Sequence, residues 1–429
     1  MRLERRSGVS NVAEVVSEIR DLVPQAPDVN EAVVGIVGEV AVRGDAAVLE
    51  YTQQFDTAGA PPPPLRVSQE DLAAALEALD PAVRAGLEVA IANVAAVSSA
   101  GVRETREVTL AQGHRVVLRE MPMARAAVYA PGGEAPYPST VVMGVVTARA
   151  AGVQEVVVCS PPPVASVILG ACALVGVAEV YQMGGAQAIA ALAYGTEQVR
   201  RVDVIVGPGN LYVQEAKRLV SDRVAIDGFA GPSDLLVLFD AADAGSIRVI
   251  ALDLLAQAEH GRASLTIAIA PDGALLDALA ADIDILGRRR EPASDATCVL
   301  IEAADLMQAL EIANAYAPEH LELIGPGAEA LAPRVRTAGC LFVGWPSATA
   351  FGDYVAGSNH ILPTAGSGRF TSGLTVQHFR RQMSEVRINP EAVEALALAG
   401  GAIAGAEGFA LHAESMRARI PEMGDNQAQ

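Results

Sequence analysis

Short apolar runs recur about every 25 residues between residues 125 and 240, and alanine-rich segments of helical length separate them. The runs read AAVYA, EVVVCS, EVYQM, DVIVG and LLVLF. They are continuous rather than alternating, which is typical of parallel strands that are covered on both faces. The pattern therefore predicts an α/β unit built on a parallel sheet.

A second α/β region is expected from the chain on either side of the first. The piece before residue 125 is helical, with Ser68 as a favourable N-cap, and the piece after residue 240 alternates helices with strands such as SLTIAIA and TCVLIE. We expect two Rossmann-like parallel-sheet domains, one inserted in the other, and a small helical C-terminal tail domain. The expected bounds are 1–25 for an N-terminal helical arm, 26–128 with 234–373 for a discontinuous α/β domain carrying most of the candidate chemistry, 129–233 for the inserted domain, and 374–429 for the tail.

Composition narrows the class of protein and partner. Hydrophobic residues make up 51% of the 429 residues, and the net charge of −20 without a basic stripe disfavours a nucleic-acid partner. The basic start lacks the apolar core of a secretory signal, and the run 161–163 of prolines interrupts the most apolar region, so no membrane span is expected. Four separated cysteines without a CxxC pair indicate buried thiols in a reducing compartment. We expect a cytoplasmic globular protein.

Turns rich in glycine or proline follow the strands expected between residues 125 and 240. They lie at 130–133, 159–163, 183–187 and 207–210. Open α/β sheets bind ligands at the carboxyl ends of their strands, so these turns are candidate binding loops. The G-x-G-x-x-G fingerprint is absent, because the turn GPGN at 207–210 lacks the third glycine. On the turns alone, dinucleotide binding and ordinary tight turns both remain open.

Several polar side chains could bind a metal ion. Gln257 and His260 are three residues apart at the end of a predicted helix and therefore share a face; an imidazole with oxygen donors suits Zn²⁺. Asp353 lies in a loop of small residues, seven positions before His360, and His412 lies in the C-terminal helix near Glu407. Each has an ordinary alternative: a solvated helix end, a turn cap or an exposed tail.

The segment APEHLEL places Glu319 beside His320. A helix is expected to end near Tyr316, because Pro318 discourages its continuation, and a strand follows, so the pair lies in a helix-to-strand loop. Histidine titrates near neutral pH and can act as a general base, and a neighbouring glutamate could orient it or activate water. From this segment alone, an exposed surface position without a catalytic role is the alternative.

Eight segments, taken in order, resemble the histidinol dehydrogenase family over residues from about 20 to 415. They are YAPGGEAPYPSTVVM, GGAQAIAALAYGTE, VDVIVGPGN, AGPSDLLV, LLAQAEHG, NAYAPEHLEL, GDYVAGSNHILPT and EGFALH. Each segment alone is a weak signal, and their joint order carries the resemblance. One departure is Asp234, where we would more often expect glutamate.

The resemblance implies a zinc-dependent enzyme that oxidises L-histidinol to L-histidine through bound histidinaldehyde and reduces two NAD, in the last steps of histidine biosynthesis. It implies that His320 is the general base and that Glu319 activates water. The implied ligands of one zinc per subunit are Gln257, His260, Asp353 and His412. The implied substrate contacts are Ser233, Gln257, His260, His320, Asp353, Glu407 and His412. The implied NAD contacts, in the inserted domain, are Tyr129, Gln187 and Asn210.

The resemblance also implies a homodimer in which the tail reaches the neighbouring subunit, so that Glu407 and His412 would complete the partner's site. Three other readings stay open. A paralogous zinc- and NAD-dependent dehydrogenase could act on another small alcohol. A zinc hydrolase could use Glu319 to activate metal-bound water, although the glycine-rich turns disfavour it. A non-catalytic binding protein would need neither the base nor the metal set.

Overall fold

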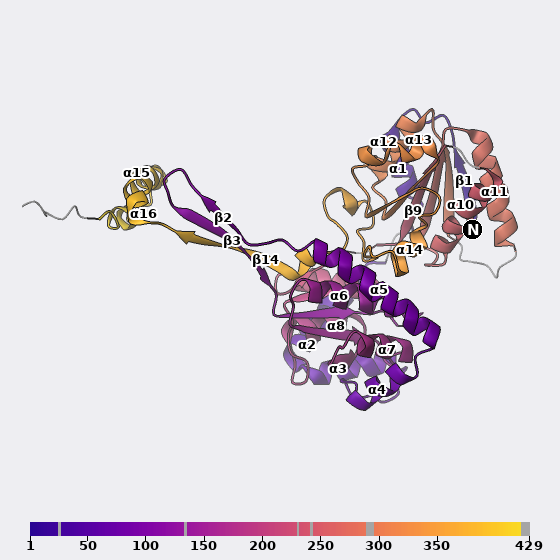
Figure 1. Ribbon diagram of the computed structural model, residues 1–429. Coiled ribbons are helices and arrows are strands. Elements are labelled where there is room, and N and C mark those ends of the chain that lie inside the picture. The colour runs from indigo at the N-terminus through magenta and orange to yellow at the C-terminus, as the bar shows by residue number, and fades with distance from the viewer. Residues whose placement is uncertain (25–26, 133–134, 230, 241–242, 289–295, 422–429) are drawn as a thin grey trace, which may run out of the picture. The chain divides into compact units, whose positions relative to one another are not determined.

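Continuous apolar strands form the two parallel sheets that the sequence pattern predicts, and helices flank both (Figure 1). The computed structural model describes residues 1–24, 27–132, 135–229, 231–240, 243–288 and 296–421. The chain divides into two units, Met1–Gly101 with Met123–Phe379 and Val102–Pro122 with Arg380–Gln429. The expected mixed α/β class is confirmed.

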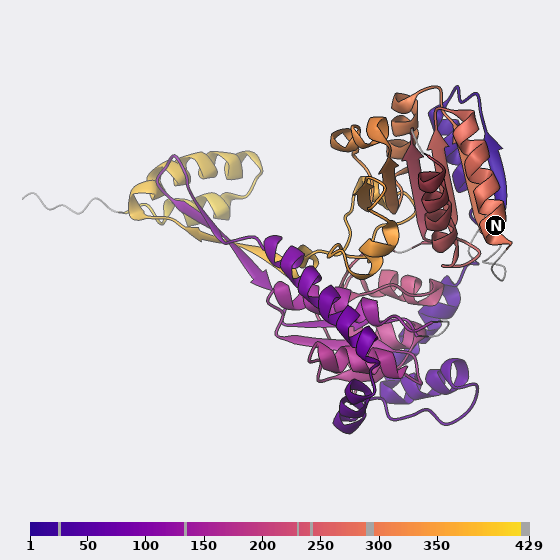
Figure 2. The ribbon, with the colours of Figure 1, turned by 45° about the vertical axis from the view of Figure 1, so that its right-hand side comes forward.

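The first unit contains two parallel sheets. The one we call the first sheet has the strand order β1-β11-β10-β9-β12-β13. Helices α10 (Ala244–Ala258) and α11 (Gly273–Gly287) cover one face, and α1 (Val12–Arg20) and α12 (Leu306–Tyr316) cover the other (Figure 2). Coverage of both faces explains why the central strands such as β9 and β10 contain few polar residues, whereas the edge strand β1 has the sequence RLERR and is largely exposed. The strands are β1 (Arg2–Arg6), β9 (Asp234–Phe239), β10 (Leu265–Ala270), β11 (Thr297–Glu302), β12 (His320–Ile324) and β13 (Cys340–Val343).

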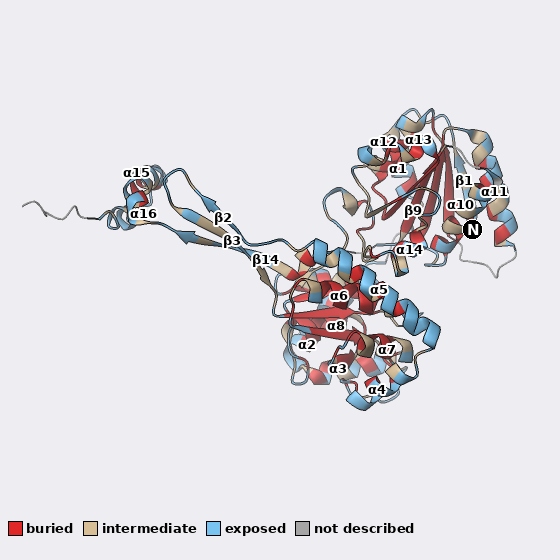
Figure 3. Ribbon diagram, in the orientation of Figure 1, coloured by how far each residue is buried: buried red, intermediate tan, exposed pale blue. Residues whose placement is uncertain are grey.

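The second sheet, also parallel, has the strand order β6-β5-β4-β7-β8. Its strands are β4 (Arg125–Tyr129), β5 (Glu155–Ser160), β6 (Val180–Gln182), β7 (Val204–Val206) and β8 (Ala225–Ile226). Helices α2 (Asn30–Arg43), α3 (Asp45–Tyr51), α8 (Gly185–Tyr194) and α9 (Leu211–Val220) share one apolar core with it. Helix α6 (Pro138–Ala150) packs on β4 and β5, next to α7 (Ser166–Leu174). The buried strands stand out from the exposed helix faces in Figure 3.

The observed packing differs from the expected domain bounds at the N-terminal side. Residues 1–24 are not a separate arm, because β1 pairs in parallel with β11 and α1 packs on the same sheet. Residues 30–100 belong with the second sheet rather than with 234–373, because Ile36, Val37 and Val40 share a core with Ile189. Ser68 caps α4 (Gln69–Glu77) as expected, by accepting a hydrogen bond from the Asp71 amide. Apolar periodicity marks the buried face of a helix but does not say which sheet covers it.

Helix α5 (Pro81–Ala100) follows α4 and packs against α6 through a narrow apolar stripe. Leu87, Ala90 and Val94 are its buried residues. Within the described part of the chain, α5 is the one helix long and apolar enough to cross a membrane by length and composition. A single helix of this kind is weak evidence for a membrane span, because helices that cover a soluble core pass the same test.

The second unit contains strands as well as the expected helices of the tail. β14 (Arg380–Arg387) pairs antiparallel with β3 (Arg115–Pro122), which pairs with β2 (Arg106–Thr109). Helices α15 (Pro390–Ala406) and α16 (Ala410–Arg417) pack against each other. The helical tail expected at 374–429 is present in α15 and α16, but residues 380–387 of its first part form a strand, because they find partners more than 250 residues earlier in the chain. Residues 422–429 of that expected domain lie outside the described residues.

The contact between α6 and β4 gives a prediction for stability. A Cβ atom on Gly144 of α6 would lie 2.6 Å from the two methyl carbons of Val128. Gly144→Ala should therefore lower the free energy of unfolding by about 1–3 kcal/mol through overpacking. Urea unfolding of purified protein measures the change.

Gly35→Ala in α2 is the matched control, because a Cβ atom there meets nothing within 4 Å. Alanine is the better helix former, so this variant should be as stable as the wild type or gain up to about 1 kcal/mol. Equal effects of the two substitutions would contradict the close contact.

Candidate active site

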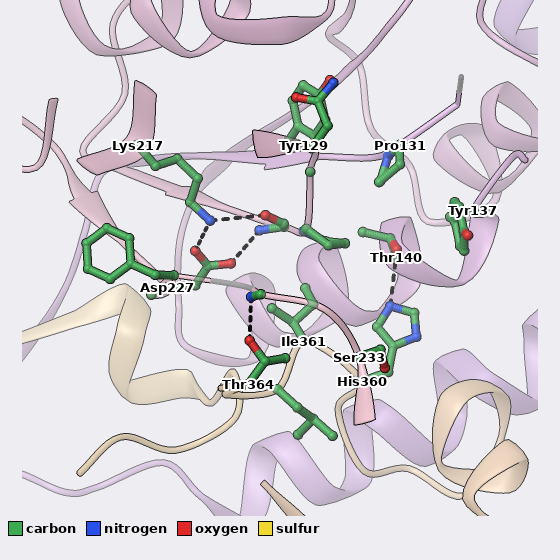
Figure 4. A pocket seen from close by; sticks show the side chains of 18 of the residues that line it. Tyr129, Pro131, Tyr137, Thr140, Lys217, Asp227, Ser233, His360, Ile361 and Thr364 are labelled. Atoms are coloured by element: carbon green, nitrogen blue, oxygen red, sulfur yellow. Dashed lines mark hydrogen bonds and ion pairs between the residues drawn. The ribbon is translucent and has the colours of Figure 1, made fainter. Parts of the chain in front are cut away.

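A pocket of about 790 Å³ in the first unit collects most of the candidate residues. Its wall includes turns at the carboxyl ends of β4 and β7 and residues at the amino ends of β9 and β12, so opposite ends of the two sheets supply it. Figure 4 shows labelled side chains from both regions, among them Tyr129, Lys217, Ser233 and His360. The sequence-predicted residues that line it are Tyr129, Gln187, Asn210, Ser233, His260, Glu319, His320 and Asp353.

Glu319 and His320 are buried where α12 gives way to β12. The helix ends at Tyr316, as the sequence predicts, and Ala317 takes a left-handed conformation with φ of 52°. His320 is the first residue of β12, so the pair lies at the start of a strand. The exposed fractions are 7% for Glu319 and 3% for His320, so the alternative of an exposed surface position is wrong.

Asp234, at the start of β9, holds both members of the pair. Its carboxylate accepts hydrogen bonds from the Glu319 amide (2.7 Å) and the Tyr316 hydroxyl (3.3 Å). Its own amide donates to Glu319 Oε2 (3.1 Å). Ser233 donates its hydroxyl to the same Glu319 oxygen and accepts a hydrogen bond from the side-chain amide of Gln257. The carboxylate of Glu319 is therefore fixed in place from two sides.

The hydrogen bond at one ring nitrogen of His320 determines which nitrogen is basic. Nδ1 lies 3.1 Å from the carbonyl oxygen of Asp234, which can only accept, so Nδ1 carries the proton. Nε2 is buried and has no hydrogen-bond partner among the described residues. Asp353 Oδ1 is 3.7 Å from Nε2, longer than a hydrogen bond. In the neutral ring, Nε2 is therefore the atom that can take a proton.

Burial and charge shift the pKa values of this cluster. Burial raises the pKa of Glu319, against the charge of His320 and the hydrogen bonds that the carboxylate accepts. Burial alone would lower the pKa of His320, but the charges of Glu319 and Asp353 outweigh it and raise that pKa to about 9. Burial, together with repulsion from Glu319, raises the pKa of Asp234 to about 7. At neutral pH the cluster thus holds protons that isolated aspartate and histidine side chains would release.

The expected zinc ligands are only partly gathered in this unit. Gln257 is in the last turn of α10 and His260 is two residues beyond its end, while Asp353 lies in α14 (Thr349–Tyr354). Burial would raise the pKa of Asp353, but His320 and the nearby rings of His360 and His260 lower it. In the described ranges, no group of three or more His, Cys, Asp or Glu side chains is gathered for a metal ion. An imidazole nitrogen, a carboxylate oxygen and an amide oxygen are nevertheless donors that zinc accepts, so these three residues fit an incomplete site.

The expected NAD contacts lie at the turns of the second sheet. The Tyr129 hydroxyl accepts a hydrogen bond from the Gly185 amide at the start of α8 (3.2 Å). Gln187 donates to Asp56 Oδ2 (3.1 Å). Asn210 caps α9 by accepting from the Val213 amide (3.1 Å) and is itself exposed. The turns at 159–163, 183–187 and 207–210 each contribute to the pocket wall; Gly133 of the turn at 130–133 lies outside the described residues.

Glu407 and His412 belong to the second unit. Glu407 caps the end of α15, and His412 lies in α16 with its ring stacked on Phe409, at 5.1 Å between centroids. Both residues are exposed. Their part in the site stays a prediction.

Sequence reasoning assigned no role to several residues of the pocket. His360 connects two segments: Nδ1 lies 3.0 Å from the Asp353 carbonyl oxygen and Nε2 lies 3.1 Å from the Thr140 hydroxyl (Figure 4). Its position in the same loop as Asp353 was the available signal. Asp56 lies at the end of a π-helix (Thr52–Asp56), where no local pattern points to a pocket. Lys217 and Asp227 also line the pocket and form an ion pair.

Comparison with known proteins gives a consistent result. The sequence matches the family model described as histidinol dehydrogenase over residues 22–420. It is 43% identical to histidinol dehydrogenase of Cereibacter sphaeroides over 410 residues, 93% of this chain and 94% of that protein. It is 41% identical to that of Ruegeria pomeroyi over 407 residues, with 93% and 94% covered. The crystal structure of histidinol dehydrogenase from Elizabethkingia anophelis matches with a TM-score of 0.90 at 28% identity, over 98% of both chains.

The raised pKa of Asp234 predicts how stability changes with pH. The pKa is about 7 in the folded chain against an ordinary 3.8, so the folded state keeps a proton that the unfolded chain releases. Stability should therefore fall as pH rises from 4 to 7, by up to about 4 kcal/mol from this group. Asp234→Asn should remove that part of the slope, measured by urea unfolding across the pH range.

Asp243→Asn is the control. Hydrogen bonds from Ser246 lower the pKa of Asp243, so its contribution is lost only below pH of about 4 and should not alter the slope above it. Parallel curves for wild type and Asp234→Asn would show that Asp234 keeps an ordinary pKa.

Proposed function

This chain belongs to the histidinol dehydrogenase family, and we propose on that premise that it catalyses the NAD- and zinc-dependent oxidation of L-histidinol to L-histidine through bound histidinaldehyde. The family makes it an oxidoreductase of histidine biosynthesis that acts on histidinol. The proposal adds the cofactors, the four-electron course and the roles of individual residues. It also includes a cytoplasmic location and a homodimer.

The free Nε2 of His320 is the observation that carries the proposal. A general base must have an unprotonated atom within reach of the substrate, and it must be oriented. When the ring is neutral, the Asp234 carbonyl keeps the proton on Nδ1 and leaves Nε2, which has no hydrogen-bond partner among the described residues, as the acceptor. Ser233, Glu319 and Asp353 line the same pocket, so a bound amino alcohol would meet donors, acceptors and the base together.

In the first oxidation, His320 Nε2 takes the hydroxyl proton of the substrate as the carbinol carbon loses a hydride, which leaves the aldehyde. In the second, a water adds to the aldehyde, and the hydrate loses a hydride from carbon and a hydroxyl proton to His320, which has released its first proton, to give the carboxylic acid. Glu319 is the group we assign to that water. Ser233 and Asp234 both donate to Oε2 of Glu319, so Oε1 is the oxygen left to accept the water's proton. The raised pKa of Glu319 makes its carboxylate a stronger base than an exposed one.

Bound NAD would accept the hydride in each oxidation, and zinc would hold the imidazole and amine of the substrate in one orientation. We assign the cofactor to Tyr129, Gln187 and Asn210. We assign the metal to Gln257, His260, Asp353 and His412, one ion per subunit. The amide nitrogen of Gln257 donates to Ser233, so its carbonyl oxygen is the atom left for the metal. A cation on Asp353 would offset one of the charges that raise the pKa of His320, which favours the neutral imidazole.

The tail supports the proposed homodimer. The described buried apolar residues of its helices α15 and α16 are small, namely Ala392, Ala397, Ala404 and Ala413. Four large apolar residues of this helix pair and its connection are exposed, with 63% for Leu398, 61% for Ile403, 53% for Phe409 and 76% for Leu411. Such a unit exposes much of the apolar surface that a stable fold buries, and a second copy of this chain would cover it. Glu407 and His412 would then serve the site of the neighbouring subunit.

Purified enzyme given histidinol and excess NAD should form two NADH per histidinol, and His320→Gln should lower kcat by about 10²–10⁴-fold with little change in KM. His378→Gln is the matched control, since the hydrogen bonds of the His378 ring within the described residues go to nearby Thr375, and His378 does not line the pocket. Glu319→Gln should impair the second oxidation more than the first, so that the yield of NADH falls toward one and a carbonyl reagent traps the aldehyde. Absence of NADH from the wild type would refute the proposed function. Full activity of His320→Gln would refute the assigned base.

Mixed dimers test the contribution of the tail. His320→Gln disables the body of one subunit and His412→Asn the tail of another, and each homodimer should be inactive. If the tail serves the neighbouring site, a mixed dimer regains one intact site, so random reassociation should restore about a quarter of wild-type activity. If each tail serves its own subunit, mixing restores nothing.

A further inference from the structure

The basic residues of this chain are nearly all arginine. Of the 31 Lys and Arg residues in the sequence, Lys217 is the only lysine. A chain that uses arginine at every other basic position has kept a lysine at this one. The two side chains differ in shape and hydration, so the position can require what an arginine lacks.

Lys217 is buried in the wall of the pocket. It lies in α9, two turns after Asn210, and its side chain is 2% exposed. The ammonium donates to the Gly207 carbonyl oxygen (3.1 Å) and pairs with Asp227 (Figure 4). Asp227 directly follows β8, which is the parallel neighbour of β7, and its side chain is 5% exposed. A charge this deeply buried is retained only with a partner.

The two side chains together bind both polar groups of Gly207. Asp227 Oδ2 accepts from the Gly207 amide (2.6 Å) while Lys217 holds its carbonyl oxygen. Gly207 itself has φ of 118°, and a Cβ atom would lie 2.1 Å from the Tyr129 carbonyl oxygen. The turn is therefore pressed against the end of β4 and fixed there. Gln214 of the same helix adds a hydrogen bond to the Gly209 carbonyl (3.3 Å).

The geometry favours an ammonium over a guanidinium. The ammonium is a compact point charge on a flexible stem, whereas the guanidinium is a wider planar fork. Here the charge must fit between the Gly207 carbonyl oxygen and the Asp227 carboxylate. The same carboxylate accepts a hydrogen bond from the Gly207 amide, so the two acceptors are held close together. An arginine at 217 would have to push Gly207 or Asp227 aside.

We propose that Lys217 and Asp227 are positioning residues that hold the Gly207–Asn210 turn in the shape that receives the nicotinamide dinucleotide. The inference rests on the proposed function. Two of the three assigned cofactor contacts adjoin the held glycine: the Tyr129 backbone is in close contact with Gly207, and Asn210 is three residues after it. A turn that is already fixed loses less freedom when the cofactor binds, so it binds the cofactor more tightly. The pair does not contact the reacting atoms and is not catalytic.

Steady-state kinetics with each substrate varied separately tests the inference. Lys217→Arg keeps the charge but should raise KM for NAD by about tenfold, with kcat and KM for histidinol within about twofold of wild type. The double variant Lys217→Met with Asp227→Asn leaves no unpaired buried charge, so it should fold, and it should show the same rise in KM for NAD. A role in stability alone would leave KM for NAD unchanged in that folded variant.

Arg125→Lys is the matched control. Arg125 is also buried and paired, with Glu155 and Glu179, but it lies at the opposite end of β4 from Tyr129. It should leave KM for NAD unchanged. The inference is overturned if Lys217→Arg has the wild-type KM for NAD, if it raises both KM values alike, or if Arg125→Lys raises KM for NAD as much. Because the wild type is assayed first, a failure of the proposed function is distinguished from a failure of this inference.

A single lysine also allows a direct measurement of the contact. Reductive methylation labels only Lys217 and the α-amino group, so mass spectrometry gives the two rates separately. In the folded wild type, Lys217 should be labelled at least about tenfold more slowly than in the same protein unfolded in guanidinium chloride, because its amine is buried and paired, and Asp227→Asn should reduce that protection. Equal labelling of Lys217 in the folded and the unfolded wild type would show that the ion pair is not closed.

Discussion

The parallel pairing of β9 with β12 is the interaction on which the site depends. Its register places His320 opposite Leu235 and so brings Glu319 beside Asp234. The hydrogen bonds among these residues give each buried carboxylate a partner, which burial of a charge requires. They also set the tautomer of His320. A shift of one residue in the register would separate the carboxylates from their donors and leave charge buried without compensation.

The pocket uses the two parallel sheets in different ways. The second sheet contributes the turns that leave the carboxyl ends of β4 and β7, where main-chain groups and glycine allow a ligand to approach closely. The first sheet contributes side chains at the amino ends of β9 and β12, where helices end and the chain enters the strand. Backbone turns suit a dinucleotide, whereas buried acids and an imidazole suit proton transfer. The two sheets thus contribute different groups to the pocket: the carboxyl ends of strands contribute backbone turns, and the amino ends contribute buried side chains.

Buried charged groups at the pocket are held by other charged or polar side chains. Asp234 holds Glu319 and His320, and Asp227 holds Lys217. Such pairs add little net stability, because desolvation offsets much of the attraction. They do fix positions, and breaking one leaves the other member uncompensated. The site is therefore defined by pairs: Asp234 and Glu319 are 85 residues apart in the chain, whereas Lys217 and Asp227 are 10 residues apart.

The sequence by itself determined the local elements and the composition of the chemistry. Apolar runs gave the buried strands, Ser68 the start of α4, and Pro318 the end of α12 before Glu319-His320, and the ordered segments gave the family. Only the tertiary structure decided that 30–100 covers the sheet of 125–226, that 380–387 pairs with 115–122, and that Asp234 meets Glu319 and Lys217 meets Asp227. Periodicity and capping act over a few residues, whereas these contacts are chosen by packing between segments that the chain order separates.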